Sequence, residues 1–133
     1  MRAALSMVLG VVLAINGIAM LAAGQTWYQL VPTVPDTGPY NPHFVHDIGC
    51  AYLAAAFGML WLARDRLVAW PAALAGAVFQ ALHALTHVWD LAAGRETPLH
   101  FAIDIVLVVA PAALALWLAW PPLAAARARA GSP

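Results

Sequence analysis

Four long apolar segments, separated by short polar ones, organise this chain. They cover approximately residues 4–24, 44–63, 67–92 and 99–120. Each approaches or exceeds the ~20 residues that a helix needs to cross about 30 Å of hydrocarbon at about 1.5 Å per residue. The pattern therefore predicts an all-α protein, a four-transmembrane-helix bundle that forms a single integral membrane domain over residues 1–133.

Polar segments between these runs predict the loops. The loop at 25–43 contains the stretch LVPTVPDTGPYNPHF, in which four prolines and Gly38 occur close together. Because proline fixes φ and glycine supplies a turn, we expect a stiff loop that lies over the outer mouth of the bundle. The two shorter connections contain RDR at 64–66 and GRE at 94–96.

The arginines predict the orientation of the bundle. Five of them fall on one side of a four-span topology, namely Arg2, Arg64, Arg66, Arg127 and Arg129, and only Arg95 falls on the other. Positive charge marks cytoplasmic loops, so both termini are expected in the cytoplasm. The lysine-free, alanine-rich composition is typical of a high-GC bacterial genome, which places the protein in a bacterial cytoplasmic (inner) membrane with the other loops facing the periplasm or exterior.

Composition agrees with a membrane protein and narrows its partners. The chain is 64% hydrophobic and 9% charged, with a mean hydropathy of +0.80, whereas a soluble domain carries about 25% charged residues. The formal net charge is zero, so there is no basic patch for nucleic acid. We expect the lipid bilayer as the surroundings. The small size favours a homo-oligomer or a subunit of a larger membrane complex.

The ionisable residues gather at one end of the predicted bundle. All five histidines lie at or near the outer ends of spans two, three and four, together with three aspartates: His43, His46, His83, His87, His100, Asp47, Asp90 and Asp104. Ionisable groups are costly inside a membrane and usually have a partner or a function there. Three helices thus bring such groups to the same leaflet.

Helical spacing predicts which of them share a face. On the third span an arc of about 80° contains Gln80, His83, His87 and Asp90. On the fourth, His100 and Asp104 are four residues apart. On the second, the i,i+4 pairs His43/Asp47 and His46/Cys50 occupy two neighbouring faces. We expect the stripe of the third span to face His46, Asp47, His100 and Asp104 across the bundle interior.

This arrangement predicts a metal site near the outer leaflet, between spans two, three and four. Neutral imidazole and carboxylate are usual ligands of Zn²⁺, Cu²⁺ and iron. The expected ligands are His83 and His87, completed from His46, Asp47, His100 and Asp104. Asp90, Gln80 and His43 are expected beside them, with Asp90 orienting an imidazole. Copper or zinc is favoured, and iron is the third candidate.

Two other functions fit the same residues. One is a haem or quinone site, since two facing histidines in an apolar slot can bind haem iron. The other is a metal-free His/Asp network that relays protons or a small ligand. A redox protein and an accessory subunit of a membrane complex both agree with these readings. The chain has no GxSxG, Walker, HExxH or CxxC motif, so whether it is an enzyme stays open.

The layout also resembles that of DoxX-like small bacterial membrane proteins. A short first span ends near an aromatic, proline-containing loop, and DIGCAYLAAAFGMLWLARDR (47–66) reads as a glycine-marked helix that closes on arginines. The resemblance covers most of the chain and implies a four-helix membrane architecture. Such proteins have been linked to quinone-dependent sulfur oxidation and membrane redox assemblies, so it also implies a redox role. It assigns no site residue.

Overall fold

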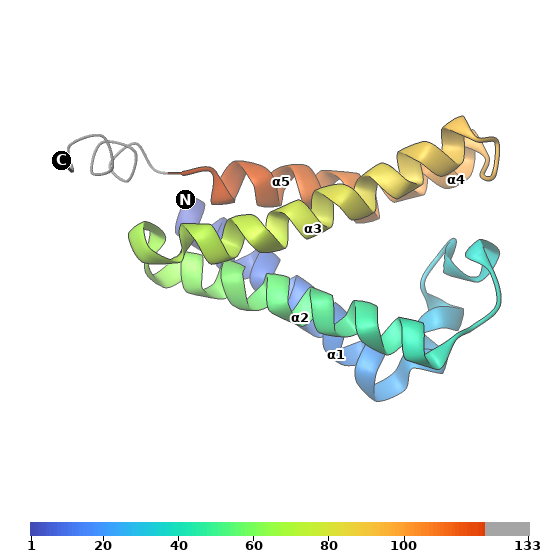
Figure 1. Ribbon diagram of the computed structural model, residues 1–133, viewed down its shortest axis with the longest axis horizontal. Coiled ribbons are helices and arrows are strands. Elements are labelled where there is room, and N and C mark those ends of the chain that lie inside the picture. Colours follow the sequence, from blue (N-terminus) through green and yellow to red (C-terminus); the bar gives the residue numbers. More distant parts are fainter. Residues whose placement is uncertain (122–133) are drawn as a thin grey trace.

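Two helical hairpins form the protein. The computed structural model describes residues 1–121, in which α1 (Arg2–Leu30) and α2 (Pro42–Arg64) make the first hairpin (Figure 1). The second hairpin consists of α3 (Arg66–Ala92) and a fourth span made of α4 (Pro98–Asp104), a π-helical segment (Ile105–Val109) and α5 (Ala110–Ala119). All four spans are long and apolar enough to cross a membrane. The predicted all-α, four-span architecture is therefore confirmed.

The two ends of the bundle differ in what they contain. The N-terminus, the α2–α3 connection and the end of α5 lie at one end, here named the terminal end (Figure 1). The α1–α2 loop and the α3–α4 turn lie at the other, the loop end. The loop end is the one predicted to face the periplasm, and this orientation stays a prediction. Arg127 and Arg129, two of the arginines behind it, lie outside the described residues.

Side-chain caps set three of the helix boundaries. The Asn41 side chain accepts a hydrogen bond from the Phe44 amide at the start of α2. Asp65 does the same for two amides at the start of α3, and Thr97 does so at the start of α4. The first amides of a helix lack intrahelical partners, and these side chains supply them. Each of these polar residues therefore marks the start of the helix that follows it.

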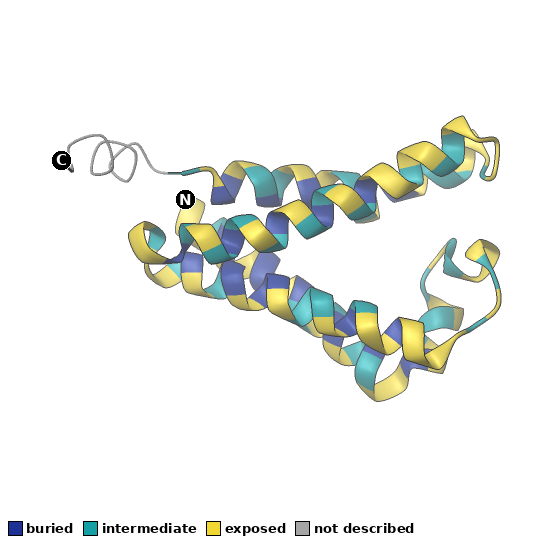
Figure 2. Ribbon diagram, in the orientation of Figure 1, coloured by how far each residue is buried: buried dark blue, intermediate teal, exposed yellow. Residues whose placement is uncertain are grey.

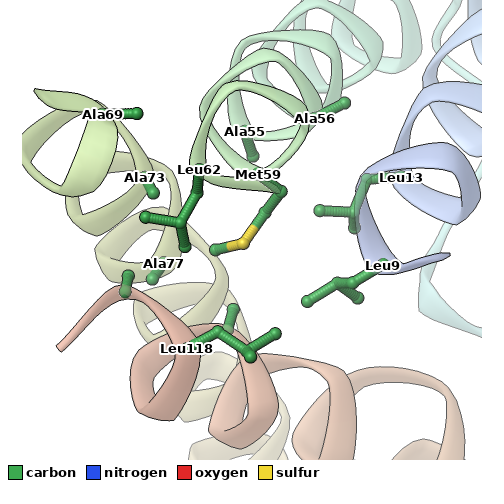
Figure 3. Packing of buried hydrophobic residues seen from close by; sticks show 12 residues of the cluster. Leu9, Leu13, Ala55, Ala56, Met59, Leu62, Ala69, Ala73, Ala77 and Leu118 are labelled. Carbon is green, nitrogen blue, oxygen red and sulfur yellow. The ribbon is translucent and has the colours of Figure 1, made fainter. Parts of the chain in front are cut away.

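The apolar core lies in the half of the bundle next to the terminal end. Large side chains of three helices meet there, with Leu9 and Leu13 of α1, Met59 and Leu62 of α2 and Leu118 of α5 pointing toward one another (Figure 3). The α3 side of this core is made of alanines, namely Ala69, Ala73 and Ala77, all of them buried. Toward the loop end the two hairpins diverge, and exposed positions become more frequent on α2 and α3 (Figures 1 and 2).

Small residues bring α2 and α3 into close contact. A Cβ atom added at Gly58 would lie 2.9 Å from both the Ala72 carbonyl oxygen and the Ala73 Cα. One added at Gly76 would lie 2.7 Å from the Ala55 Cα. Helices in lipid associate mainly through such close packing, because lipid tails are as apolar as the side chains.

Two arginines tie the terminal end together. The Arg66 guanidinium donates hydrogen bonds to the carbonyls of Leu118 and Trp120, at 2.9 and 2.8 Å. These carbonyls lie where α5 ends and have no amide of a following turn to bond. The Arg2 guanidinium lies over the Trp117 ring, 4.4 Å from its centroid. Arg2 therefore connects the first hairpin to the second at this end.

A wider helical turn interrupts the fourth span directly after Asp104. In an uninterrupted α-helix the Pro111 ring would press against the carbonyl four residues earlier and leave it without a donor. The chain instead forms a π-helical segment over Ile105–Val109, closed by a hydrogen bond from the Ala110 amide to the Ile105 carbonyl. Turns of this kind occur often beside functional sites.

The glycine contact gives a stability prediction. Gly58→Ala should lower the free energy of unfolding in detergent by about 1–3 kcal/mol, because the new methyl group meets backbone atoms of α3 that cannot move independently. Ala75→Leu, at an exposed position of α3, is the control and should leave stability almost unchanged. Equal unfolding midpoints for Gly58→Ala and the wild type would show that the α2–α3 contact is not this tight.

Candidate metal centre

The α3–α4 turn builds the site. Gly94, with φ +69°, follows the end of α3 in the left-handed conformation that glycine adopts most readily. The Arg95 amide bonds the Asp90 carbonyl and the Gly94 amide bonds the Leu91 carbonyl, which is the Schellman arrangement. Arg95 also forms an ion pair with the Asp90 carboxylate at 2.8 Å. The chain thus reverses within a few residues, and Glu96 follows the turn immediately.

Asp104 is the centre of the polar contacts. Its side chain is 2% exposed, and its Oδ2 lies 2.8 Å from Nδ1 of His87 on the facing helix. With the carboxylate ionised, Nδ1–H donates this bond. The Thr33 hydroxyl of the α1–α2 loop lies 3.2 Å from Oδ1 of Asp104 and also contacts the Pro32 carbonyl. The buried carboxylate thus has partners from α3 and from the long loop.

Thr33 has an unusual backbone conformation. Its φ of 75° makes it the one non-glycine residue with positive φ in the described part of the chain. A β-branched residue in this region is strained, and such strain persists only where the surroundings hold it in place. Contact with Asp104 is one such restraint, because it fastens the loop to the second hairpin.

Glu96 brings a second carboxylate to the same place. Its side chain is 8% exposed, and its Oε2 lies 3.9 Å from Nε2 of His100. Burial raises the pKa of the Glu96 carboxyl; a hydrogen bond to Asp104 and the negative charge there raise it further, while His100 and His87 oppose the change. Within residues 1–121 the other oxygen, Oε1, is buried and has no hydrogen-bond partner.

Together these contacts define a three-residue group, here called the His/Glu/Asp group: His87, Glu96 and Asp104. Each offers one ligand atom, and the three atoms lie within 4.8 Å of one another. Ligand atoms around a tetrahedral Zn²⁺ lie about 3.4 Å apart. A small contraction of these side chains would therefore bring them to coordination distance. His100, whose Nε2 lies 3.9 Å from Oε2 of Glu96, is a candidate for a fourth ligand.

His83 lies beside this group, one turn deeper. Its ring stacks on Phe79 and meets Tyr52 of α2 edge-on, with both centroid distances 6.2 Å. Its centroid is 5.0 Å from that of His87. Gln80 is 2% exposed, and its Nε2 has no hydrogen-bond partner among the described residues. The predicted stripe of α3 is therefore directed into the bundle at Gln80, His83 and His87.

The residues predicted from α2 lie elsewhere. His43 and Asp47 pair with each other at 3.4 Å, with side chains 88% and 62% exposed. His46 is exposed as well, and its Nε2 lies near α1, 3.6 Å from where a Cβ of Gly24 would be. In the part of the chain that the structure describes, these three residues do not join the His/Glu/Asp group, and their role as ligands stays a prediction.

Sequence reasoning missed Glu96 and Thr33. Both lie in segments that we interpreted only as connections between spans. The four-residue spacing of Glu96, His100 and Asp104 was the available signal for Glu96, because it extends the face of the fourth span by one turn. Nothing in the sequence indicates that Thr33 contacts a residue 71 positions away.

No family model, curated protein or solved structure matches this chain. The four-span layout implied by the resemblance to DoxX-like proteins is present, without a family match to accompany it.

The Thr33 contact can be tested by an isosteric substitution. Thr33→Val removes the hydroxyl, and amide hydrogen exchange over residues 31–41 should become several-fold faster, as expected for a loss of about 1 kcal/mol. Thr26→Val, at an exposed position of α1, is the control. Unchanged exchange in Thr33→Val would mean that the prolines alone hold the loop.

Proposed function

We propose that this protein binds a divalent transition-metal ion at the loop end of its second hairpin, through His87, Glu96 and Asp104. One observation carries the proposal: the buried carboxylate of Asp104, the partly buried carboxylate of Glu96 and the His87 imidazole offer ligand atoms within 4.8 Å of one another. The buried Glu96 Oε1 that lacks a partner is the kind of atom that a cation would satisfy.

Charge supports a cation at this place. Two carboxylates that are both nearly buried cannot both stay ionised without a compensating positive charge. In the described residues, the nearby candidates for that charge are two titratable imidazoles, His87 and His100. A divalent ion would balance both carboxylates at once and would accept the lone pair of His87 Nδ1 in place of its proton.

The donor set narrows the choice of ion. Imidazole and carboxylate suit Zn²⁺, Fe²⁺ and Cu²⁺, and the group contains no sulfur that would select Cu⁺. One imidazole with two carboxylates is a combination of histidine and carboxylate ligands that zinc sites use. We therefore put Zn²⁺ first. A role in a membrane redox assembly or as an accessory subunit, with the site facing the periplasm, remains part of this proposal.

The proposal predicts the metal content of the purified protein. Wild-type protein, extracted in detergent without chelator, should carry about one ion per chain by elemental analysis. Glu96→Gln and Asp104→Asn keep side-chain size but remove a charged ligand, so each should lower metal occupancy at least tenfold. The same measurement identifies the element.

Asp47→Asn is the matched control, because it makes the same change at an exposed aspartate on α2. It should keep its metal, and a loss there would instead support the ligand set predicted from sequence. Helical content and elution volume of each variant must match the wild type. The proposal fails if wild-type protein contains no metal and takes up none from added Zn²⁺, Fe²⁺ or Cu²⁺.

A metal-free proton network is the second candidate. It is favoured by the raised pKa of the Glu96 carboxyl, to which burial and a hydrogen bond with Asp104 contribute, and by the ring contact that continues from His87 to His83. If the protein binds no metal, we expect proton flux in liposomes that Asp104→Asn abolishes and Asp47→Asn does not.

A haem is disfavoured here, because the rings of His83 and His87 meet directly and leave no slot between them.

A further inference from the structure

The outward face of α2 carries several exposed polar residues near the loop end. Gly49 and Leu53 contact α1, and Ala55 and Gly58 contact α3. At about 100° per residue, Cys50 is turned about 60–100° from the two α1 contacts and about 80–140° from the two α3 contacts. Cys50 is exposed, so its side of α2 lies between the two contact strips and faces outward.

That side carries ionisable groups near the loop end. Its exposed residues, here called the α2 outer face, are His43, His46, Asp47, Cys50, Ala54, Phe57 and Trp61. They fall within an arc of about 100°. His43 and Asp47 form the exposed ion pair described above, and His46 lies at the edge of this face, with its Nε2 near α1. Toward the terminal end the face is aromatic: the ring centroids of Phe57 and Trp61 lie 5.7 Å apart.

Lipid is a poor environment for the part of this face nearest the loop end. The 23 residues of α2 span about 34 Å, against about 30 Å of hydrocarbon. Asp47 then lies about 5 Å inside the boundary, and Cys50 about one turn deeper. A carboxylate at this depth usually faces protein or water, not acyl chains. A protein surface that covers this face would remove that cost.

We propose that the α2 outer face is covered by the same face of a second copy of this chain. Each face contains an imidazole donor, His43, beside a carboxylate acceptor, Asp47, so it is complementary to itself. A two-fold axis along the membrane normal brings residues of equal depth together. The His43/Asp47 pair of one copy then meets that of its partner, and imidazole–carboxylate bonds form between copies as well as within them.

The shape of the face suits such a contact. Cys50 and Ala54 are small residues one turn apart. They lie between the His43/Asp47 pair, toward the loop end, and the aromatic rings of this face, toward the terminal end. Small residues at this spacing let two membrane helices approach closely. On a two-fold axis through this point, Cys50 of one copy lies opposite Cys50 of the other.

Cysteine cross-linking in native membranes tests the arrangement. The chain has a single cysteine, so wild-type protein treated with a short bis-maleimide should give a covalent dimer at Cys50 without engineering. Cys50→Ser should give none. In the Cys50→Ser background, Ala54→Cys on the same face should restore the dimer. Leu85→Cys, an exposed position of α3 at similar depth, should not.

Co-purification of two differently tagged copies from detergent supplies a second measurement. His43→Ala/Asp47→Ala should lower the co-purified fraction several-fold, while Glu96→Gln should leave it unchanged, so this outcome is independent of the proposed metal site. The inference is overturned if neither Cys50 nor Ala54→Cys yields a dimer, if Leu85→Cys cross-links equally well, or if Cys50 cross-links to a different protein.

Discussion

A carboxylate buried between two helices is the constraint on which the loop end depends. Asp104 is almost completely enclosed, and an ionised carboxylate in such a place must be compensated by hydrogen bonds, a proton or a cation. Three separate features converge on it: His87 of α3, Thr33 of the long loop and Glu96 of the tight turn. The strained backbone of Thr33, the glycine turn at Gly94 and the π-helical segment after Asp104 all lie within or beside this convergence. Each of these features can be explained by its contribution to positioning or enclosing the Asp104 carboxylate.

Hydropathy predicted the four spans for two reasons. A segment that crosses lipid must satisfy its own backbone hydrogen bonds, which a helix does, and its side chains must be apolar over about 20 residues. The polar breaks were predicted for the same reason, and they act as caps at Asn41, Asp65 and Thr97. The angle between the hairpins was not predictable. It depends on where small residues allow contact, as at Gly58 and Gly76, and on single bonds such as those of Arg66 to the end of α5. Periodicity within one helix contains no information on either.

Two members of the His/Glu/Asp group, His87 and Asp104, were expected from helical spacing. The face shared by Gln80, His83 and His87 is a property of one helix, and its direction toward Asp104 followed from the antiparallel hairpin. The contribution of α2 did not follow, because two adjacent i,i+4 pairs leave the inward direction ambiguous by about 100°. In the structure the His43/Asp47 pair points outward. Glu96 and Thr33 are supplied by loops, where spacing says little about which side chain comes near a given helix.

The divergence of the two hairpins gives the molecule a different width in each half of the bilayer. At the terminal end, alanine and glycine contacts and the two arginines hold the four helices in a narrow cross-section. At the loop end the two hairpins stand apart, with the α1–α2 loop between them, while α3 and α4 remain in contact (Figure 1). A wedge of this kind displaces more lipid from one leaflet than from the other. In a bilayer such a shape would favour a bent membrane or an adjusted lipid packing around the protein.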